Sequence, residues 1–295
     1  MKYVQKYFLI QFCSVAIFLT FIHSVKVYGQ NYLDLAGATY CYQQPFNDID
    51  KPNYNTINQT TAVLNVPLKI KKDYLMLSPF MQLYDVRFGD YKTSYRSAQF
   101  SVSWLHQWKN ERWNTAFVAI GQSNALKTNW FEQNTFQAGG AIVNTFTKNK
   151  DFKIKFGVYG NAEFFGPYFL PLLGVDWNIS ERLGLYGLLP SYLFLEYKIV
   201  PDKFHGKISF DTELSSYRNQ PMNYFRVNDN HVKLVFDLYL TKNVVFSAEA
   251  GHSVLRKFVS GVRKNGKASE SDLNYRDAFL VRAGLYFRVS TESKN

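Results

Sequence analysis

A repeated alternation of apolar and polar side chains runs through the chain after about residue 30, and it constrains the fold more than any other feature. Between residues 152 and 161, for example, Phe152, Ile154 and Phe156 alternate with Lys153 and Lys155. The same pattern recurs in three other clear segments: 99–108, 204–214 and 279–289. Because successive side chains of a strand point to opposite faces, this pattern predicts antiparallel β-strands with one apolar and one polar face.

Two all-β architectures fit such strands: a transmembrane barrel with apolar side chains facing lipid, and a soluble sandwich with apolar side chains in its core. Long strands, an 18% aromatic content and connections of alternating length favour the barrel. The predicted short connections are Lys71 to Asp73, Lys109 to Arg112, Lys148 to Asp151, Ser180 to Arg182, Pro201 to Lys203 and Thr241 to Asn243. The predicted long loops are Gln43 to Thr56, Ser123 to Gln133, Arg218 to Asn230 and Lys257 to Leu273. Short turns at one rim and long loops at the other are typical of outer-membrane barrels.

Aromatic residues near the segment ends are candidates for the interfacial girdles of such a barrel. These candidates are Tyr84, Phe88, Trp104, Trp108, Trp113, Trp130, Trp177, Tyr197, Tyr239 and Phe287.

The connections predict the number of strands. Six short turns with seven outer loops give about fourteen strands in an antiparallel up-and-down barrel, with both chain termini on the periplasmic side. The segment 166–199 is ambiguous because Pro167, Pro171 and Pro190 interrupt its strand pattern, and proline lacks the backbone N–H that a ladder needs. A twelve-stranded barrel with a kinked insertion there is the alternative.

Residues 1–29 have a different character and read as a cleaved signal peptide. Lys2 and Lys6 precede an apolar run from residue 7 to residue 21. Residues 27–29, which end at Gly29, are small or tolerated at the positions before a signal-peptide cleavage site. The run is shorter than the roughly 20 residues of a spanning helix. The expected organisation is therefore a signal peptide over residues 1–29 and one barrel domain over residues 30–295, located in the outer membrane of a Gram-negative bacterium.

Removal of the signal peptide changes the thiol content and the charge. Cys13 is lost, which leaves Cys41 without an intramolecular disulfide partner. The formal net charge falls from +11 to +8, because three lysines and no acid are removed. An exported chain with evenly spread charges is not expected to bind nucleic acid; anionic lipid head groups or an anionic solute fit better.

The order of signal peptide, alternating strands, brief charged turns and the final strand from Ala278 to Phe287 resembles bacterial outer-membrane β-barrel proteins. Residues 177–210, with Leu188-Leu189-Pro190-Ser191 and His205-Gly206-Lys207, look like an uncharacterised family of such barrels with no assigned activity. The resemblance implies contact with outer-membrane lipid and lipopolysaccharide, and assembly by the insertion machinery. That machinery usually reads a terminal aromatic residue, whereas eight residues follow Phe287 here.

The inward faces of the strands carry the charged candidates for a lumen. They are Lys153, Lys155, Glu196, Lys198, His205, Lys207, Asp211, Glu213, Lys233, Asp237, Glu249, Arg282 and Arg288. Ionisable side chains in membrane proteins pair with one another or face water. One interpretation is a porin-like channel with a weak anion preference from the cationic excess. The other is a network of ion pairs that fills the interior.

No catalytic or metal site is expected. His205, Ser209 and Asp211 share one strand face, but a rise of roughly 3.3 Å per residue holds His205 too far from Ser209 for a nucleophile–base hydrogen bond. The sequence contains none of the common motifs for serine hydrolases, zinc proteases, thiol redox sites or phosphate loops. Two acidic pairs, Asp48 with Asp50 and Glu270 with Asp272, read as solvated loop charge rather than as calcium sites, and no cofactor is expected.

Two functions from different classes therefore remain open. The first is a passive channel or uptake barrel for small solutes. The second is a structural or surface-interaction barrel without a conducting pore, which presents its long loops outward. A hydrolase at the barrel rim is a third, weaker possibility.

Overall fold

A computed structural model describes residues 32–45, 55–88, 91–220 and 222–290. These residues form sixteen strand segments and two short 3-10 turns. The strands are β1 (Tyr32–Pro45), β2 (Thr56–Leu64), β3 (Val66–Ile70), β4 (Asp73–Phe88), β5 (Tyr91–Gln107), β6 (Trp113–Leu126), β7 (Phe136–Asn149), β8 (Phe152–Glu163), β9 (Gly166–Asn178), β10 (Leu183–Leu189), β11 (Tyr192–Val200), β12 (Phe204–Arg218), β13 (Asn223–Tyr239), β14 (Val244–Lys264), β15 (Lys267–Asp272) and β16 (Ala278–Ser290). No helix among these residues has the length and apolar character to cross a membrane. The predicted signal peptide and cleavage site lie outside the described residues.

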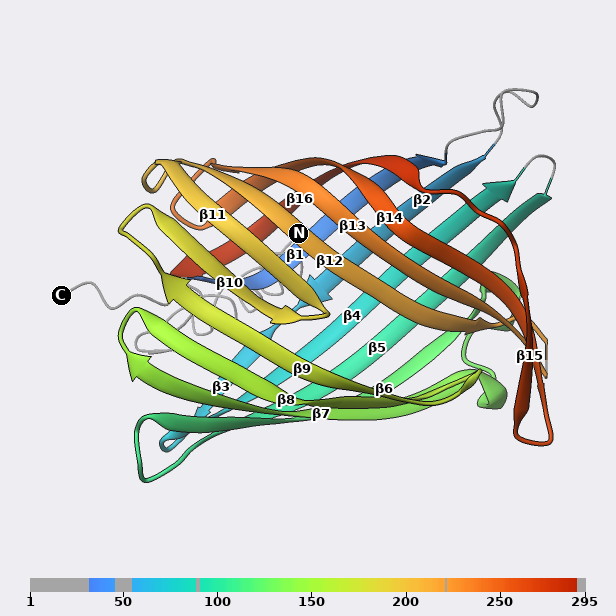
Figure 1. Cartoon of the computed structure of the whole chain (residues 1–295), viewed down its shortest axis with the longest axis horizontal. Coiled ribbons are helices and arrows are strands. Elements are labelled where there is room, and N and C mark those ends of the chain that lie inside the picture. Colours follow the sequence, from blue (N-terminus) through green and yellow to red (C-terminus); the bar gives the residue numbers. More distant parts are fainter. Residues whose placement is uncertain (1–31, 46–54, 89–90, 221, 291–295) are drawn as a thin grey trace, which may run out of the picture.

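The strands close into a single antiparallel barrel (Figure 1). Strands that follow one another along the chain pair, except that β2 and β3 both pair with β4 and that β14 pairs with β16 as well as with β15. β16 returns to β1, and pairing of β13 with β14 completes the ring. When β2 and β3 are taken as one interrupted strand and β15 as a branch of β14, the ring has fourteen strands. The prediction of a fourteen-stranded barrel is confirmed, and the twelve-stranded and sandwich alternatives are wrong.

All six predicted short connections lie at the rim where β1 begins and β16 ends. Tyr32 pairs with Ser290 at this rim, and backbone hydrogen bonds close the turns there, for example from Trp113 to Asn110 and from Lys203 to Val200. Lys71 and Asp202 adopt positive φ angles of 57° and 59° in two of these turns. The rim is therefore built from tight turns whose charged residues lie outside the apolar belt.

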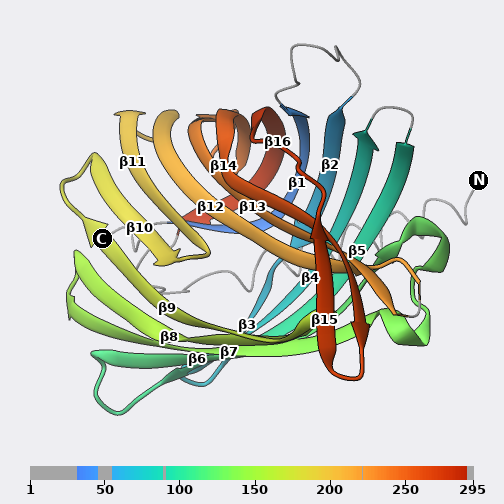
Figure 2. The ribbon, with the colours of Figure 1, turned by 45° about the vertical axis from the view of Figure 1, so that its right-hand side comes forward.

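Two of the predicted long loops are instead strand. β12 extends to Arg218 and β13 begins at Asn223, so the loop expected from Arg218 to Asn230 shrinks to a short turn. The loop expected from Lys257 to Leu273 is a β-hairpin of β14 and β15, which projects from the loop end of the barrel in Figure 2. Strand pairing needs only backbone groups. Beyond the apolar belt it continues without the alternation that marks a strand in the sequence.

The remaining two predicted loops differ from each other. The connection after β6 starts at Lys127 rather than at Ser123, because β6 extends to Leu126, and it contains both 3-10 turns. Most of the loop predicted from Gln43 to Thr56 lies outside the described residues.

The ambiguous segment holds three strands rather than a kinked insertion. β9 accommodates Pro167 and Pro171, and a short hairpin of β10 and β11 turns at the cis peptide bond between Leu189 and Pro190. β10 and β11 have only 7 and 9 residues, whereas the flanking β9 and β12 have 13 and 15. The barrel wall therefore extends less far toward the loop end at this hairpin than at the neighbouring strands.

Exposure alternates along the strands as the sequence predicts. In β13, Val232, Leu234 and Phe236 are exposed, whereas Lys233 and Asp237 are buried. The outer surface carries many further exposed apolar side chains, including Phe100, Trp104, Ile142, Ile154, Phe156, Val158, Ile208, Phe246, Val281 and Leu285. A closed barrel with an apolar exterior and a polar interior pairs the backbone groups of its neighbouring strands within hydrocarbon, which makes this a transmembrane barrel.

Several girdle candidates lie on the outer surface as expected, among them Trp104, Trp108 and Tyr197. Tyr84 is fully buried inside the barrel instead, and the Tyr239 hydroxyl is 3.3 Å from Arg288 Nη1 in the interior. Both tyrosines lie near strand ends but on the inward face, which sequence position alone does not reveal. The side chain of Phe88 lies outside the described part.

The lipid-facing surface has a direct test. We expect Leu234→Arg, at an outward position midway along β13, to lower the free energy of unfolding by about 2–4 kcal/mol, because a cation near the bilayer midplane is poorly solvated. Leu240→Arg, at an equally exposed position beside the turn rim, is the matched control and should cost only about 0–1 kcal/mol. Urea titration in lipid vesicles measures both values. Equal costs at the two positions would contradict the assigned lipid face.

Candidate functional site

The inward face of the barrel gathers the charged residues that the sequence singles out. Six of those residues are buried there: Lys153, Glu196, His205, Lys233, Asp237 and Arg288. The others on this face are partly buried: Lys155, Lys198, Lys207, Asp211, Glu213, Glu249 and Arg282. Lys198 is half-buried, two residues beyond Glu196 on the same face of β11. Lys155 pairs with Asp176 of β9 at 2.7 Å, an acid that the sequence analysis did not select.

Near the turn rim, a compact ion-pair network links strands from both ends of the chain. Arg288 of β16 contacts Asp237 of β13 at 2.7 Å and Asp34 of β1 at 2.6 Å. Lys207 of β12 also binds Asp237 at 2.6 Å and lies 3.6 Å from Glu196. Because cations and carboxylates alternate here, a chain of ion pairs spans the interior of the barrel near the turn rim.

A second network lies nearer the middle of the barrel. Lys233 bridges Asp211 at 2.6 Å and Glu249 at 2.7 Å, and Arg282 is 3.3 Å from Glu249. In these two networks each cation has at least one carboxylate within ion-pair distance. Pairing of this kind offsets the cost of removing charges from water.

A third network was missed by the sequence analysis. His231 lies between Asp211 at 3.2 Å and Asp229 at 3.0 Å, and Arg256 binds Asp229 at 2.6 Å and the Gln43 side chain. Asp229 was missed because it fell within a predicted loop. Arg256 was missed because the adjacent Leu255, with φ of 55°, breaks the regular alternation of β14. Four consecutive polar residues, from Asn228 to His231, follow Val227, so no alternation marks this part of β13 in the sequence.

Glu213 differs from the other inward acids in its partners. Its carboxylate accepts hydrogen bonds from Gln59 of β2 at 2.9 Å and from Gln82 of β4 at 3.1 Å. These strands are far from β12 around the ring, so the side chains meet across the interior. Within the part of the chain that the structure describes, no lysine or arginine pairs with Glu213.

The tips of β12 and β13 lean into the barrel at the loop end. Tyr217 of β12 stacks on Tyr84 and donates a hydrogen bond to Gln82 at 3.0 Å, while Phe225 of β13 stacks on Tyr95 with ring centroids 4.7 Å apart. On the opposite face of the β12 tip, the Ser216 hydroxyl forms hydrogen bonds with Gln137 of β7 and Glu163 of β8.

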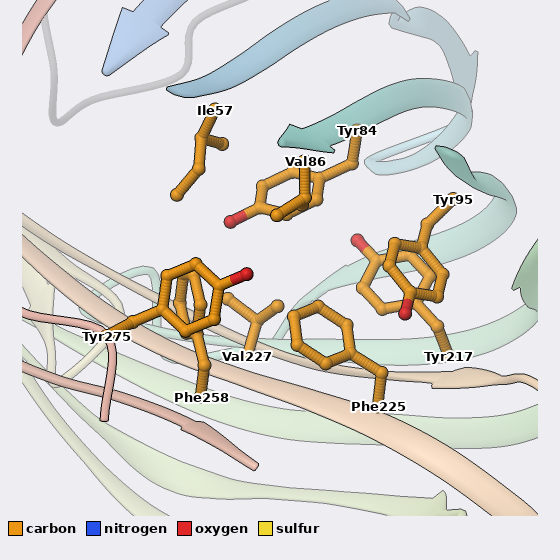
Figure 3. Close-up of a cluster of buried hydrophobic side chains, with 9 residues drawn as sticks. All are labelled: Ile57, Tyr84, Val86, Tyr95, Tyr217, Phe225, Val227, Phe258 and Tyr275. Carbon is orange, nitrogen blue, oxygen red and sulfur yellow. The ribbon is translucent and has the colours of Figure 1, made fainter. Parts of the chain in front are cut away.

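We call the resulting group of buried side chains the mouth cluster, shown in Figure 3: Ile57, Tyr84, Val86, Tyr95, Tyr217, Phe225, Val227, Phe258 and Tyr275. Its members come from β2, β4, β5, β12, β13, β14 and the segment before β16, on opposite sides of the ring. Apolar packing therefore joins opposite walls of the barrel at the loop end of the interior.

Cavities lie inside the barrel, and two of them border the ion-pair networks and the mouth cluster. The smaller, about 210 Å³, is bordered by the turn-side network, including Lys207, Asp237 and Arg288. The larger, about 430 Å³, lies beside the mouth cluster, since Gln82 both lines it and accepts the bond from Tyr217. Most side chains around the larger cavity are polar: Thr39, Gln59, Thr61, Gln82, Ser97, Gln99, Gln122, Asp211, Thr212, Glu213, Ser215, Arg282 and Tyr286. Hydrogen-bonding groups at such density suit a small polar ligand.

The trio of His205, Ser209 and Asp211 is engaged separately. His205 is 3.2 Å from Glu196, and Asp211 binds Lys233 and His231, so neither orients a nucleophile. Among the described residues, no group of acids, histidines or cysteines has the spacing of a metal site. Glu270 binds Arg226 at 2.8 Å rather than remaining a free loop carboxylate, and Asp48 and Asp50 lie outside the described residues.

Three solved structures show a limited likeness to the chain. The COG4313 outer membrane channel from Pseudomonas putida F1 has a TM-score of 0.49 and 8% identity, over 90% of this chain and 99% of that chain. The NanC porin has a TM-score of 0.41 and 10% identity, over 86% and 100%. The outer membrane phospholipase A from Escherichia coli has a TM-score of 0.35 and 12% identity, over 88% and 94%. These low values carry no inference about activity.

Sequence comparison places the chain more firmly. No curated protein sequence matches it. The model of one family, described as Domain of unknown function (DUF6268), matches residues 94–288. This match spans well over half of the chain and includes β6 to β14, so the protein belongs to the DUF6268 family.

Proposed function

We propose that this protein is an outer-membrane uptake barrel that binds a small solute in its interior while its outer mouth is closed. One observation carries the proposal: the larger cavity, about 430 Å³ and lined mainly by hydrogen-bonding side chains, lies beneath the mouth cluster. A barrel serving only as a structural element has no evident need for an unfilled polar chamber at this position, since apolar packing there would be more stable.

The location and partners belong to the same proposal. Closed barrels with apolar belts are the form in which strands span the bacterial outer membrane, and the signal-like residues 1–29 fit export across the inner membrane. We place the tight turns in the periplasm and the mouth cluster at the cell surface. Lipopolysaccharide and phospholipid then surround the apolar belt, and the outer-membrane insertion machinery assembles it.

The charged lumen residues act mainly as the frame of the chamber in this proposal. Lys207, Lys233 and Arg288 are each held by carboxylates within 2.7 Å, which leaves little free positive charge to select anions. Recognition by hydrogen bonds from amide and hydroxyl side chains is therefore a better fit than ion selectivity. No catalytic role is assigned, because no nucleophile, base and orienting group converge.

Solute influx into proteoliposomes tests the proposal. We expect vesicles containing the protein to admit small polyols such as glycerol faster than protein-free vesicles. Gln99→Phe, which fills part of the larger cavity, should reduce influx several-fold because the ring occupies the solute path. Phe100→Leu, on the lipid side of the same strand, is the matched control and should not change it. Influx equal to that of protein-free vesicles at high protein content would overturn the proposal.

The second candidate is a structural or surface-interaction barrel. The observation in its favour is the bonded charge that crosses the turn-side half of the interior, around Arg288 and Asp237. A barrel of this kind predicts no influx for the wild type or for any variant with an opened mouth. The same vesicle experiment therefore separates the two candidates.

A further inference from the structure

The wall of the barrel is interrupted beside the larger cavity. The β10–β11 hairpin stops about halfway along the barrel, while β9 and β12 continue toward the loop end (Figure 1). The last pairs of the hairpin join Leu189 to Leu173 of β9 and Tyr192 to Asp211 of β12. Beyond them, within the described residues, no strand pairing connects β9 with β12.

We call this interruption the side gap and define it by residues 167–172 of β9, 189–191 of the hairpin turn and 212–215 of β12. Its upper end is closed by contacts of the β8–β9 turn. There the backbone N–H of Phe164 donates to the Ser216 hydroxyl at 3.0 Å, and the guanidinium of Arg218 lies 4.0 Å from the Phe164 ring centre. The side gap is therefore bounded on every side.

The two edges of the side gap differ in their backbone chemistry. On β9, Pro167 and Pro171 carry no N–H, a common feature of edge strands. On β12, the N–H of Thr212 bonds to the carbonyl of Ser191 at 3.0 Å as the last link to the hairpin. The N–H of Leu214 points to the same edge because this direction repeats every second residue. Such an edge is unstable against pure hydrocarbon and favours a polar group or water beside it.

The surroundings of the side gap are apolar outside and polar inside. Phe169 and Leu173 are 73% and 66% exposed on the outer surface, and Leu189 is 40% exposed at the hairpin turn. The larger cavity, in contrast, is lined by all of residues 212–215, so it extends along the β12 edge of the gap. Glu213 lies on this cavity, held by two neutral glutamine amides. A molecule in the gap would have its apolar part among lipid chains and its polar part beside Glu213.

We propose that the side gap is a lateral port through which an amphiphile dissolved in the outer leaflet places its head group in the larger cavity. The inference rests on the proposed uptake function and names its substrate class. The head carries hydrogen-bond donors, such as hydroxyl or amino groups, for Glu213 and for the cavity glutamines. Anionic heads are disfavoured beside Glu213, because its carboxylate has amide partners rather than a cation in the described structure, and Arg282, which also lines this cavity, is held 3.3 Å from Glu249.

Spin labelling tests whether lipid reaches the gap. Both native cysteines are replaced by serine, and a nitroxide is attached at Leu214→Cys in the port or at Thr61→Cys, which lines the same cavity from the fully paired strand β2. In lipid nanodiscs, the label at position 214 should collide with membrane-soluble oxygen several-fold more often than with a water-soluble nickel complex. The label at position 61 should not show this excess. An equal ratio at both positions would overturn the port.

Ligand binding tests the head group. Octyl glucoside, below its micelle concentration, should immobilise the label at position 214 at a concentration roughly tenfold lower than octanoate, since Glu213 accepts from hydroxyls and repels a carboxylate. Glu213→Gln should bring the two concentrations close together, and heat-dependent gel migration confirms that the variant is folded. Equal binding of both amphiphiles to the wild type, or a ratio unchanged by Glu213→Gln, would overturn the assignment.

The two proposals fail separately. Lipid contact at position 214 without any solute influx would reject uptake and retain the port. Solute influx without lipid contact at position 214 would reject the port and retain uptake through the mouth.

Discussion

The double substitution Tyr84→Ala with Tyr217→Ala should convert a barrel with little ion conductance into a conducting one. The two rings stack with centroids 6.1 Å apart, and they join β4 to the inward-leaning tip of β12. Their removal leaves space in the centre of the mouth cluster and also removes the Tyr217 hydrogen bond to Gln82. Because an apolar constriction excludes water and ions until it widens, we expect at least about a tenfold rise in open time or conductance in planar bilayers.

Controls separate gating from general damage. Tyr217→Phe keeps the ring and loses only the hydroxyl, so this variant should stay quiet. Phe100→Ala with Trp104→Ala removes two aromatic side chains from the lipid face and should likewise stay quiet. Loss of large buried aromatics costs about 3–5 kcal/mol each in stability, so heat-dependent gel migration must first show that the double variant is folded. A folded double variant without conductance would contradict the gating role of the mouth cluster.

Arg288→Ala should cause one of the largest losses of stability among single substitutions in the interior. The guanidinium binds Asp34 at 2.6 Å and Asp237 at 2.7 Å, and it lies 3.8 Å from the Tyr32 ring centre. Truncation leaves two carboxylates inside the barrel with one fewer cation. Removing one partner of a buried ion pair costs about 3–5 kcal/mol, because the remaining charge is neither paired nor well hydrated.

Urea titration in lipid vesicles measures this loss. Arg182→Ala, in an exposed turn at the same rim, is the matched control and should change the free energy of unfolding by less than about 0.5 kcal/mol. Arg288→Lys keeps the positive charge but not the planar guanidinium that binds two carboxylates. Its loss of unfolding free energy should therefore lie between those of Arg182→Ala and Arg288→Ala. A loss below about 1 kcal/mol for Arg288→Ala would show that the turn-side network does not hold the barrel together.

Several features of the fold could be predicted from residue order because they depend on local chemistry. Lys233 and Asp237 are inward because they alternate with Val232, Leu234 and Phe236 across an apolar belt. A membrane barrel imposes this period on every strand that crosses lipid. The tight turns at the rim where β1 begins leave an equally local signal of charged and turn-forming residues.

The interior was only partly predictable. The alternation predicts an inward face for the charged side chains of the crossing strands, but it does not predict their partners. Asp229 and Arg256 escaped notice because β12, β13 and β14 continue past the belt, where lipid no longer imposes alternation. Glu213 meets Gln59 and Gln82 over sequence separations of 154 and 131 residues, and no local pattern encodes such a meeting.

The sequence by itself determined a barrel, its strand number, its tight-turn rim and the lipid or lumen side of each crossing strand, because the bilayer selects those features residue by residue. The tertiary structure alone decided how the ring is filled. The inward lean of the β12 and β13 tips, the mouth cluster and the short β10–β11 hairpin depend on closure of the whole ring, which brings opposite walls into contact. Contact across the ring depends on strand tilt and register summed over every neighbouring pair, a quantity that no single segment carries.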